Sequence, residues 1–588
     1  MFPRIATIEH MCESLSLFSE PTKAWFEHAF GQPTEAQAQA WPAIHSGRNV
    51  LVIAPTGSGK TLAAFLSAID RLMTVSRKRR AGVRVLYVSP LKALAVDVAK
   101  NLEQPLEGIA AQCEAQGLPA PKIAVANRSG DTTAQERRRI ASHPPDILVT
   151  TPESLYLLLT SKAGRILGTV DTVIVDEIHA VAGTKRGSHL ALSLERLENL
   201  VAESRRRDAM DRNDGESKVS DDSANEPHLQ RIGLSATVNP PEEAARFLTG
   251  GRPVTIVNPG GRPAMDLRMV EPLENMRDLQ SVNAMQRVGG VDSERPTPHI
   301  SGVTPAMQRL AERKGIVQTG DSGLSAGGNG VLVGAAGDRT SGSIWPVVER
   351  SVLDEILAHR TTLVFVNSRG VAEKLTARLN DLYAQTRHEV DPDLVRDMGS
   401  PEGREGFASH YDAVVGSTTM LVGSHEGDDV IAMAHHGSVS KERRKMIEER
   451  LKRGELRCVV ATSSLELGID MGSVDLVIQI DTPLSVSSGL QRVGRADHQV
   501  GGVSHALFYP LTRQQIVTGA ASLESMIAGD IEPLAVLKNP LDVLAQQTVA
   551  AAVMHDLKAD DWYVTVRRSA PFADLPRDMF DAVIGMMS

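Results

Sequence analysis

The sequence has few cysteines, no long apolar run and no excess of basic residues, and each absence excludes a class of protein. Its 588 residues include only three cysteines, far apart and in no Cys-x-x-Cys pair, so no zinc or iron–sulfur site is predicted. Isolated thiols are typical of a reducing compartment, and we expect a cytoplasmic protein. No apolar run reaches the roughly 18 residues of a membrane span, and the first residues lack the apolar core of a signal peptide. The formal net charge of −9 argues against a generally basic coat for nucleic acid, but does not exclude a local basic groove.

What the sequence does contain is a glycine-rich segment, APTGSGKT, between an apolar run and a helical repeat. Gly57 and Gly59 let successive N–H groups point at one anion, next to the positive end of a helix. The segment therefore predicts a phosphate-binding loop, in which Lys60 reaches the β- and γ-phosphates of ATP and the Thr61 hydroxyl binds Mg²⁺. The predicted loop contacts are Ala54, Thr56, Gly57, Ser58, Gly59, Lys60 and Thr61.

A second element places two adjacent carboxylates at the end of an apolar strand, Val173-Ile174-Val175-Asp176-Glu177. The carboxyl end of a strand is where ligands bind in open α/β sheets. Asp176 is predicted to hold Mg²⁺ through water, and Glu177 to orient and deprotonate the attacking water. An apolar strand that ends in Asp-Glu is common by itself, and its place after a phosphate loop gives it weight.

Further strings lie around these two elements: PTEAQ at 33–37, SPLKALA at 89–95, TTPES at 150–154, DEIH at 176–179, SAT at 235–237, VFVNSR at 364–369, ATSSLELGID at 461–470 and QRVGRADH at 491–498. In this order they resemble the motifs of superfamily-two helicases, and among these the Lhr (large helicase-related) family. Three more strings resemble Lhr proteins in particular: KRGSHLA at 185–191, SIWP at 343–346 and HHGSVS at 435–440.

The resemblance implies roles in an ATP site shared by two domains. Gln37 is expected to read adenine, and Gly468 and Asp470 to shape the same cleft. Arg495 is the expected arginine finger, with Arg492 supporting the interface as part of the catalytic set. His498 stands where many relatives have arginine, so its action as a second sensor stays open. His179, Ser235 and Thr237 are expected to couple the γ-phosphate site to the domain interface.

The same resemblance implies contacts with the backbone of a single nucleic-acid strand. Hydroxyls, backbone amides and one lysine suit phosphate oxygens and hold a strand without reading its sequence. The expected contacts are Pro90, Lys92, Thr151, Pro152, Ser368, Arg369, Thr462 and Ser463. Taken alone, Lys92 or Thr151 is more typical of a solvated loop or a helix cap.

The alternation of short apolar strands and helices predicts an α/β protein with parallel sheets. Strands are predicted at 50–54, 83–89, 122–126, 146–150, 172–176, 230–235, 361–367, 430–434, 458–462, 475–480 and 504–509. With the resemblance, we expect a helical lead-in with the Q motif (1–47), a RecA-like domain (48–262), a flexible linker (263–342), a second RecA-like domain (343–530) and an incomplete winged-helix domain (531–588). Two polar stretches, 203–227 and 388–428, are predicted surface insertions.

The sequence thus predicts an ATP- and Mg²⁺-dependent helicase or translocase on single-stranded DNA. The resemblance implies 3′-to-5′ movement, unwinding of DNA or RNA–DNA duplexes and a part in DNA repair. Two alternatives stay open: an ATP-dependent RNA helicase or ribonucleoprotein remodeller, and an ATP-regulated nucleic-acid clamp that does not unwind because the C-terminal part is missing.

Overall fold

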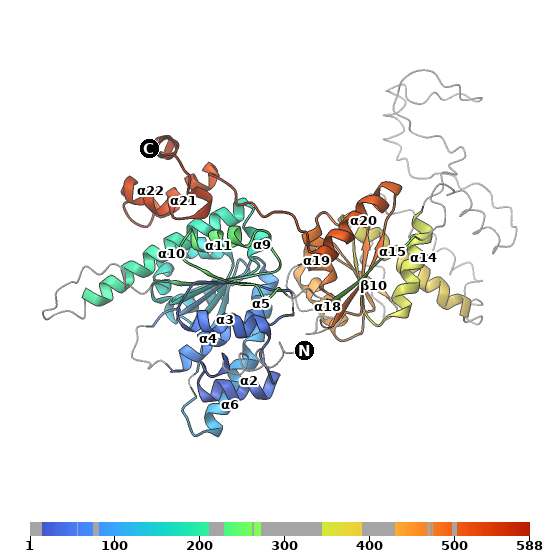
Figure 1. The fold of residues 1–588 in the computed structure, drawn as a ribbon, viewed down its shortest axis with the longest axis horizontal. Helices are drawn as coiled ribbons and strands as arrows, with labels where there is room; N and C mark the ends of the chain where they lie inside the picture. Colours follow the sequence, from blue (N-terminus) through green and yellow to red (C-terminus); the bar gives the residue numbers. More distant parts are fainter. Residues whose placement is uncertain are drawn as a thin grey trace, which may run out of the picture.

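The chain forms two parallel β-sheets, each covered by helices on both faces, with a group of C-terminal helices packed on the first (Figure 1). The computed structural model describes residues 14–55, 57–74, 81–120, 122–210, 228–260, 264–271, 344–390, 430–466, 472, 474–496 and 502–587. Among these residues, no helix is long and apolar enough to cross a membrane.

The first sheet has the strand order β3-β4-β2-β5-β6-β1-β7, and every neighbouring pair is parallel. Its strands are β1 (Val50–Ile53), β2 (Val85–Val88), β3 (Val125–Arg128), β4 (Ile147–Thr150), β5 (Thr172–Val175), β6 (Gln230–Ser235) and β7 (Thr255–Val257). Five of the seven strands are buried along their whole length, as expected of a parallel sheet with helices on both faces.

Side chains that alternate along these strands enter two separate cores. One face is covered by α2 (Glu20–Phe30), α3 (Glu35–His45), α4 (Lys60–Thr74), α5 (Lys92–Asn101) and α6 (Glu103–Ala115). The other is covered by α8 (Pro152–Leu159), the 3₁₀ helix Lys162–Thr169, α9 (Ile178–Val181), α10 (Lys185–Met210) and α11 (Pro241–Thr249), with α7 (Ala134–Ser142) adding Ile140.

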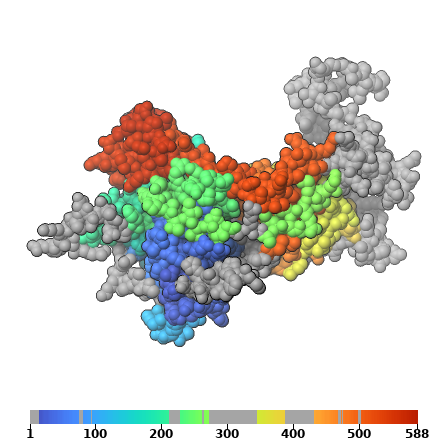
Figure 2. Space-filling model, viewed as in Figure 1, coloured from blue at the N-terminus to red at the C-terminus, as the bar shows by residue number. Residues whose placement is uncertain are grey.

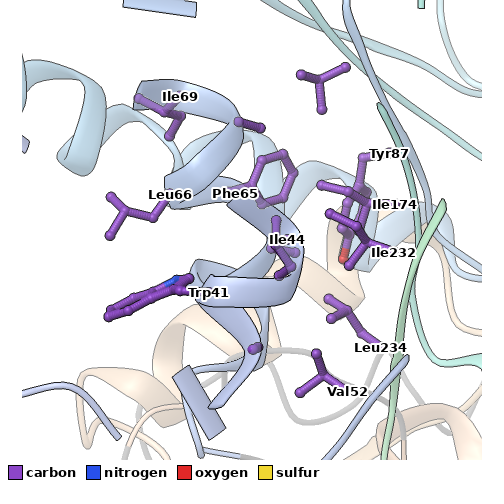
Figure 3. Packing of buried hydrophobic residues seen from close by; sticks show 14 of the residues in the cluster. Trp41, Ile44, Val52, Phe65, Leu66, Ile69, Tyr87, Ile174, Ile232 and Leu234 are labelled. Carbon is purple, nitrogen blue, oxygen red and sulfur yellow. The ribbon is translucent and has the colours of Figure 1, made fainter. Parts of the chain in front are cut away.

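The aromatic part of the first core holds α3 and α4 against the sheet (Figure 3). Trp41 is fully buried, and its indole N–H donates to the Ala63 carbonyl at 3.2 Å, so α3 is tied to α4. Phe65 of α4 stacks on Tyr87 of β2, with the ring centroids 5.1 Å apart. This packing fixes α4, whose first residue is Lys60, and it also fixes the ring of Tyr87, whose hydroxyl points into the predicted site.

The second sheet has the order β10-β11-β9-β12-β13-β8, again with parallel pairs throughout. Its strands are β8 (Ala264–Met269), β9 (Thr362–Phe365), β10 (Ala432–His435), β11 (Cys458–Ala461), β12 (Leu476–Ile480) and β13 (Val503–Tyr509). One face is covered by α14 (Trp345–Ala358) and α15 (Arg369–Val390), and the other by α18 (Lys441–Lys452), α19 (Val486–Val493) and α20 (Arg513–Ala528).

The C-terminal helices lie on α10 of the first domain (Figures 1 and 2). They are α21 (Leu541–Ala552), α22 (Ala559–Arg567), the 3₁₀ helix Ala570–Phe572 and α23 (Arg577–Met587). Arg196 of α10 donates to the Gln547 side-chain oxygen at 2.8 Å and to the Ala550 carbonyl at 3.3 Å. Leu192 joins their apolar core, so this C-terminal part is anchored to the first sheet rather than to the second.

The predicted α/β class with two parallel sheets is confirmed, and the predicted strands match observed ones to within three residues at each end. The start of the linker was wrong, because Ala264–Met269 forms the edge strand β8. Met265, Leu267 and Met269 alternate along β8 and pack against the core of the second domain. The glycines and prolines that precede them in the sequence hide this alternation. Strand β7 was also missed.

Both predicted insertions begin too early, because helices continue into their polar first residues. Helix α10 runs to Met210, so 203–210 is helical, and α15 runs to Val390. Exposed helix ends are polar, so composition alone does not separate them from loops. The remainder of both insertions, and of the linker from 272 onward, lies outside the described residues.

Candidate functional site

Three of the predicted motifs meet at the carboxyl ends of the adjacent strands β5, β6 and β1. The phosphate loop follows β1, the two carboxylates follow β5, and the SAT string ends β6. The Ala54 N–H donates to the Ser235 carbonyl at 3.1 Å, so the loop and the SAT string begin side by side. Motifs about 60 to 180 residues apart in the sequence thus form one site.

The loop has the backbone that its glycines predict. Gly57 and Gly59 have φ of 80° and 76°, a region that residues with a Cβ rarely adopt. The Lys60 ammonium is buried and donates to the carbonyls of Ala54 and Pro55, at 2.5 and 2.7 Å. Burial lowers the pKa of Lys60, while the nearby Glu177 carboxylate acts in the opposite direction. A phosphate that enters this loop would replace the two carbonyls as the acceptor of the Lys60 ammonium.

Gln37 braces the loop from α3. Its side-chain oxygen accepts from the Thr34 N–H at 2.9 Å, and its amide nitrogen donates to the Gly59 carbonyl at 3.2 Å. The Thr34 hydroxyl donates to the Ser58 carbonyl at 2.9 Å. A Cβ on Gly59 would lie 2.5 Å from the Gln37 amide nitrogen, so glycine is also needed for this contact. Thr34 was missed as a site residue, although Thr-Glu-Ala-Gln is the signal of a capping box. Adenine reading by Gln37 stays a prediction.

Replacing Gln37 with alanine is expected to weaken ATP binding more than folding. The loop loses the brace at Gly59, and α3 keeps only half of its capping box, so the affinity for ATP should fall by about tenfold, roughly 1.4 kcal/mol. Binding of a fluorescent ATP analogue and thermal melting measure the two effects. Gln39→Ala is the matched control, because it removes an exposed amide from the same helix. Equal losses of ATP affinity in the two variants would contradict a role for Gln37 in holding the loop.

Asp176 and Glu177 are buried at the start of α9. One carboxylate oxygen of Asp176 accepts a hydrogen bond from the Tyr87 hydroxyl. The other accepts a hydrogen bond from the Glu177 N–H at 2.9 Å. Burial and the neighbouring Glu177 carboxylate raise the pKa of Asp176 to about 7. Glu177 has φ 48°, in the left-handed region that residues other than glycine rarely adopt. Tyr87 was missed by the sequence analysis, because nothing local connects it to Asp176.

His179 lies between the Glu177 carboxylate and the SAT string, and its part in coupling stays a prediction. The Ala236 N–H donates to His179 Nδ1 at 3.2 Å, which makes Nδ1 an acceptor, so the Ser235 hydroxyl donates to the same nitrogen, also at 3.2 Å. Nε2 lies 3.4 Å from a Glu177 carboxylate oxygen. Burial lowers the pKa of His179 to about 4, so the ring is neutral at pH 7 with its proton on the side of Glu177. Thr237 is exposed at the end of the string.

Asp176→Asn is expected to stabilise the nucleotide-free protein above pH 7. In the folded state the Asp176 pKa is about 7, above its ordinary value of 3.8, so ionisation opposes folding increasingly from pH 4 to pH 7 and constantly above it. Asparagine removes this cost and can still accept the Tyr87 hydroxyl. The melting temperature of the variant should exceed that of the wild type at pH 8, and the difference should shrink toward pH 5. A difference that grows as the pH falls would contradict the burial of this charge.

Oxygen donors at the site fit Mg²⁺ shared with a nucleotide. Asp176 and Thr61 offer a carboxylate and a hydroxyl, which are hard ligands of the kind Mg²⁺ prefers. A carboxylate with two hydrogen bonds retains further acceptor positions. Among the described residues no group of three or more acidic, His or Cys side chains could cage a metal, so the remaining ligands would be phosphates and water.

Arg495 and Arg492 play different parts in the second domain. Arg495 is buried after α19 and donates to the Glu466 carbonyl at 2.8 Å. Its charge adds to the lowering of the Lys60 pKa, so the two cations lie close enough to interact. Arg492 is held by the side chains of Glu466, at 2.5 Å, and Gln479, at 2.8 Å. Arg492 thus holds side chains together within the second domain, and its support of the interface stays a prediction.

The predicted nucleic-acid residues follow two neighbouring strands in each sheet, at the carboxyl ends of those strands. Pro90 and Lys92 follow β2, Thr151 and Pro152 follow β4, Ser368 and Arg369 follow β9, and Thr462 and Ser463 follow β11. Lys92, Ser368, Arg369 and Ser463 are exposed. Thr151 is buried and caps α8 by accepting the Ser154 N–H at 3.4 Å, so its hydroxyl serves the helix. Their contact with nucleic acid stays a prediction.

Four predicted site residues fall outside the described part of the chain: Thr56, Gly468, Asp470 and His498.

Family models match three segments of the chain. "DEAD/DEAH box helicase" matches residues 34–245, "Helicase conserved C-terminal domain" matches 407–498, and "Large helicase-related protein, winged helix domain" matches 524–588. The last match begins in α20 and includes the C-terminal helices.

Individual relatives match nearly the whole chain. The Escherichia coli protein "Lhr helicase/uracil glycosylase" is 49% identical over 97% of the chain and 32% of its own length. "ATP-dependent helicase Lhr-Core protein 2" of Thermococcus barophilus is 33% identical over 99% of the chain and 54% of its own length. Among solved structures, Mycobacterium smegmatis helicase Lhr bound to ssDNA and AMP-PNP is 46% identical with a TM-score of 0.72, over 98% of this chain and 58% of that one. The chain therefore spans about one third to just over half of the length of these proteins.

Proposed function

The chain belongs to the large helicase-related (Lhr) family of DEAD/DEAH-type helicases, and we propose that it is an ATP-hydrolysing helicase or translocase on single-stranded DNA. One observation carries the proposal: the phosphate loop, the carboxylates of Asp176 and Glu177, and the SAT string meet at the carboxyl ends of the adjacent strands β1, β5 and β6. The charge of Arg495 in the second domain adds to the lowering of the Lys60 pKa, which supports a site shared by both domains. Such a site hydrolyses ATP only when both domains are in place, and this makes hydrolysis depend on their closure.

The residues of the first domain suit the opening steps of the reaction. The Lys60 ammonium moves from the Ala54 and Pro55 carbonyls to the β- and γ-phosphates, while the loop amides hold the remaining phosphate oxygens. Asp176 and Thr61 would hold Mg²⁺, which would supply positive charge beside these phosphates. Glu177 then orients a water molecule and accepts its proton. Arg495 stabilises the charge on the transferred group from the opposite side.

The hydrogen bonds of His179 offer a path from hydrolysis to movement. His179 contacts Glu177 on one side and Ser235 on the other, so a shift of the carboxylate alters the end of β6. Because closure and hydrolysis alternate, the edges of the two sheets approach and separate once per ATP, and this displacement moves the domains along a strand.

The finer assignments are that the protein moves 3′ to 5′, unwinds DNA or RNA–DNA duplexes and acts in DNA repair. Family membership supports them, as does the M. smegmatis relative, whose structure has bound ssDNA. A strand-displacement assay with 3′-tailed and 5′-tailed DNA and hybrid duplexes tests them. We expect ATP-dependent displacement from 3′ tails only. Displacement from 5′ tails would contradict the direction, and DNA-stimulated ATP hydrolysis without displacement would support the clamp alternative for this length of chain.

A further inference from the structure

Asp131 of the first domain contacts one lysine from each domain, near the predicted nucleic-acid contacts. Its carboxylate accepts the Lys92 ammonium of the first domain at 2.7 Å on one oxygen. The other oxygen lies 3.3 Å from the Lys441 ammonium at the start of α18 in the second domain. All three side chains are at least one-third exposed, so this ion cluster lies at the surface.

The loop that carries Asp131 is held by hydrogen bonds that do not involve the two lysines. The Asp131 N–H donates to the Ser129 hydroxyl at 3.3 Å, and the Arg137 guanidinium donates to the Gly130 carbonyl at 2.9 Å. These bonds fix the loop that follows β3. The Lys92 ammonium passes over Gly130, 3.0 Å from the position that a Cβ would take there. Either lysine can therefore leave Asp131 without breaking the hydrogen bonds that hold the loop.

The cluster lies where a strand that touches both domains would cross between them. The loop of Asp131 follows β3, which lies next to β4 and its Thr151-Pro152 segment. Helix α18 follows β10, which neighbours β11 and the Thr462-Ser463 segment. Lys441 therefore follows the carboxyl end of β10, beside the predicted contacts that follow β11, although none of the strings quoted above includes it.

We propose that Lys441 binds a backbone phosphate of the single strand, and that Asp131 occupies Lys92 and Lys441 until phosphates replace it. The inference rests on the proposed function. A carboxylate and a phosphate offer an ammonium the same kind of charged oxygen, so they compete for it. The Lys92 ammonium holds the pKa of Asp131 below its usual range, with a further contribution from Lys441, so the competing carboxylate is charged at pH 7. Exposed ion pairs contribute little to stability, so a nucleic-acid strand can displace these.

The competition predicts opposite effects for the two partners. Asp131→Asn frees both lysines and should tighten binding of a fluorescent oligothymidylate by about two- to fivefold, the range of a surface ion pair. Lys441→Gln should weaken binding, and should reduce the slope of log K against log salt by about 0.7, the value for one phosphate on a single strand. In the Lys441→Gln background, Asp131→Asn should tighten binding less, because only Lys92 remains to be freed.

Matched variants separate exchange from general charge. Glu442→Gln removes the same charge from the exposed residue next to Lys441, and Lys445→Gln removes a lysine one turn further along α18. Both should bind like the wild type. Equal tightening in Glu442→Gln, or unchanged or weaker binding in Asp131→Asn, would overturn the inference. Wild-type binding with a non-hydrolysable ATP analogue is measured first, because its absence would count against the proposed function itself.

Discussion

Glu177→Gln is expected to lower the turnover of ATP by about 10²- to 10⁴-fold, the usual contribution of a general base. Glutamine keeps the size of the side chain and its contact with His179, but cannot accept a proton from water. ATP binding should persist, because Lys60 and the loop amides are unchanged. Single-turnover hydrolysis and binding of a fluorescent ATP analogue measure the two properties separately.

Glu243→Gln is the control for this substitution. It changes a half-exposed carboxylate on α11 that pairs with Arg246, so it should leave hydrolysis unaltered. Turnover by Glu177→Gln within tenfold of the wild type would refute the role of Glu177, and loss of ATP binding would show that the carboxylate supports the loop instead.

Arg495→Ala is expected to reduce turnover by about 10³-fold or more, as removal of an arginine finger does. The residue contributes its charge from the second domain, so ATP should still bind to the loop of the first. Loss of the hydrogen bond that Arg495 donates to the Glu466 carbonyl should lower the melting temperature only slightly, because its acceptor is a neutral backbone group. Hydrolysis rates at saturating ATP, with and without ssDNA, measure the effect.

Arg492→Ala should behave differently, although it lies only three residues away. Its guanidinium is bound by Glu466, Gln479 and Asn367 and lies over the ring of Phe365, 5.3 Å from its centroid. Removing it leaves a half-buried carboxylate unpaired, which costs about 3–5 kcal/mol when a buried ion pair is broken. A clear fall in melting temperature is expected here. Similar melting temperatures for both arginine variants would contradict the division of roles.

The parts of the site that could be predicted are those with a local pattern. Gly57, Lys60 and Asp176 lie in short strings whose chemistry depends on neighbours in the sequence, and the two sheets follow from the spacing of apolar strands. The positions of these strings at the carboxyl ends of adjacent strands follow from parallel topology alone.

The missed parts depend on contacts between distant residues. Tyr87 meets Asp176 across 89 positions, and Asp131 meets Lys441 across two domains. No periodicity or motif records such pairs, because either partner alone is an ordinary surface or core residue. Strand β8 was missed for another reason. Its residues Met265, Leu267 and Met269 pack on the core of the second domain, but the residues before them have the composition of a linker.

The central claim is that ATP hydrolysis takes place between the two domains and is governed by a single nucleic-acid strand. The most direct test compares ATP hydrolysis by the wild type and by Arg495→Ala without nucleic acid, with ssDNA and with RNA of the same length. We predict that ssDNA stimulates the wild type strongly, and that Arg495→Ala is inactive in all three conditions. Stimulation by RNA alone would instead support an RNA helicase. A wild-type rate that neither nucleic acid changes, or full activity without Arg495, would contradict the account.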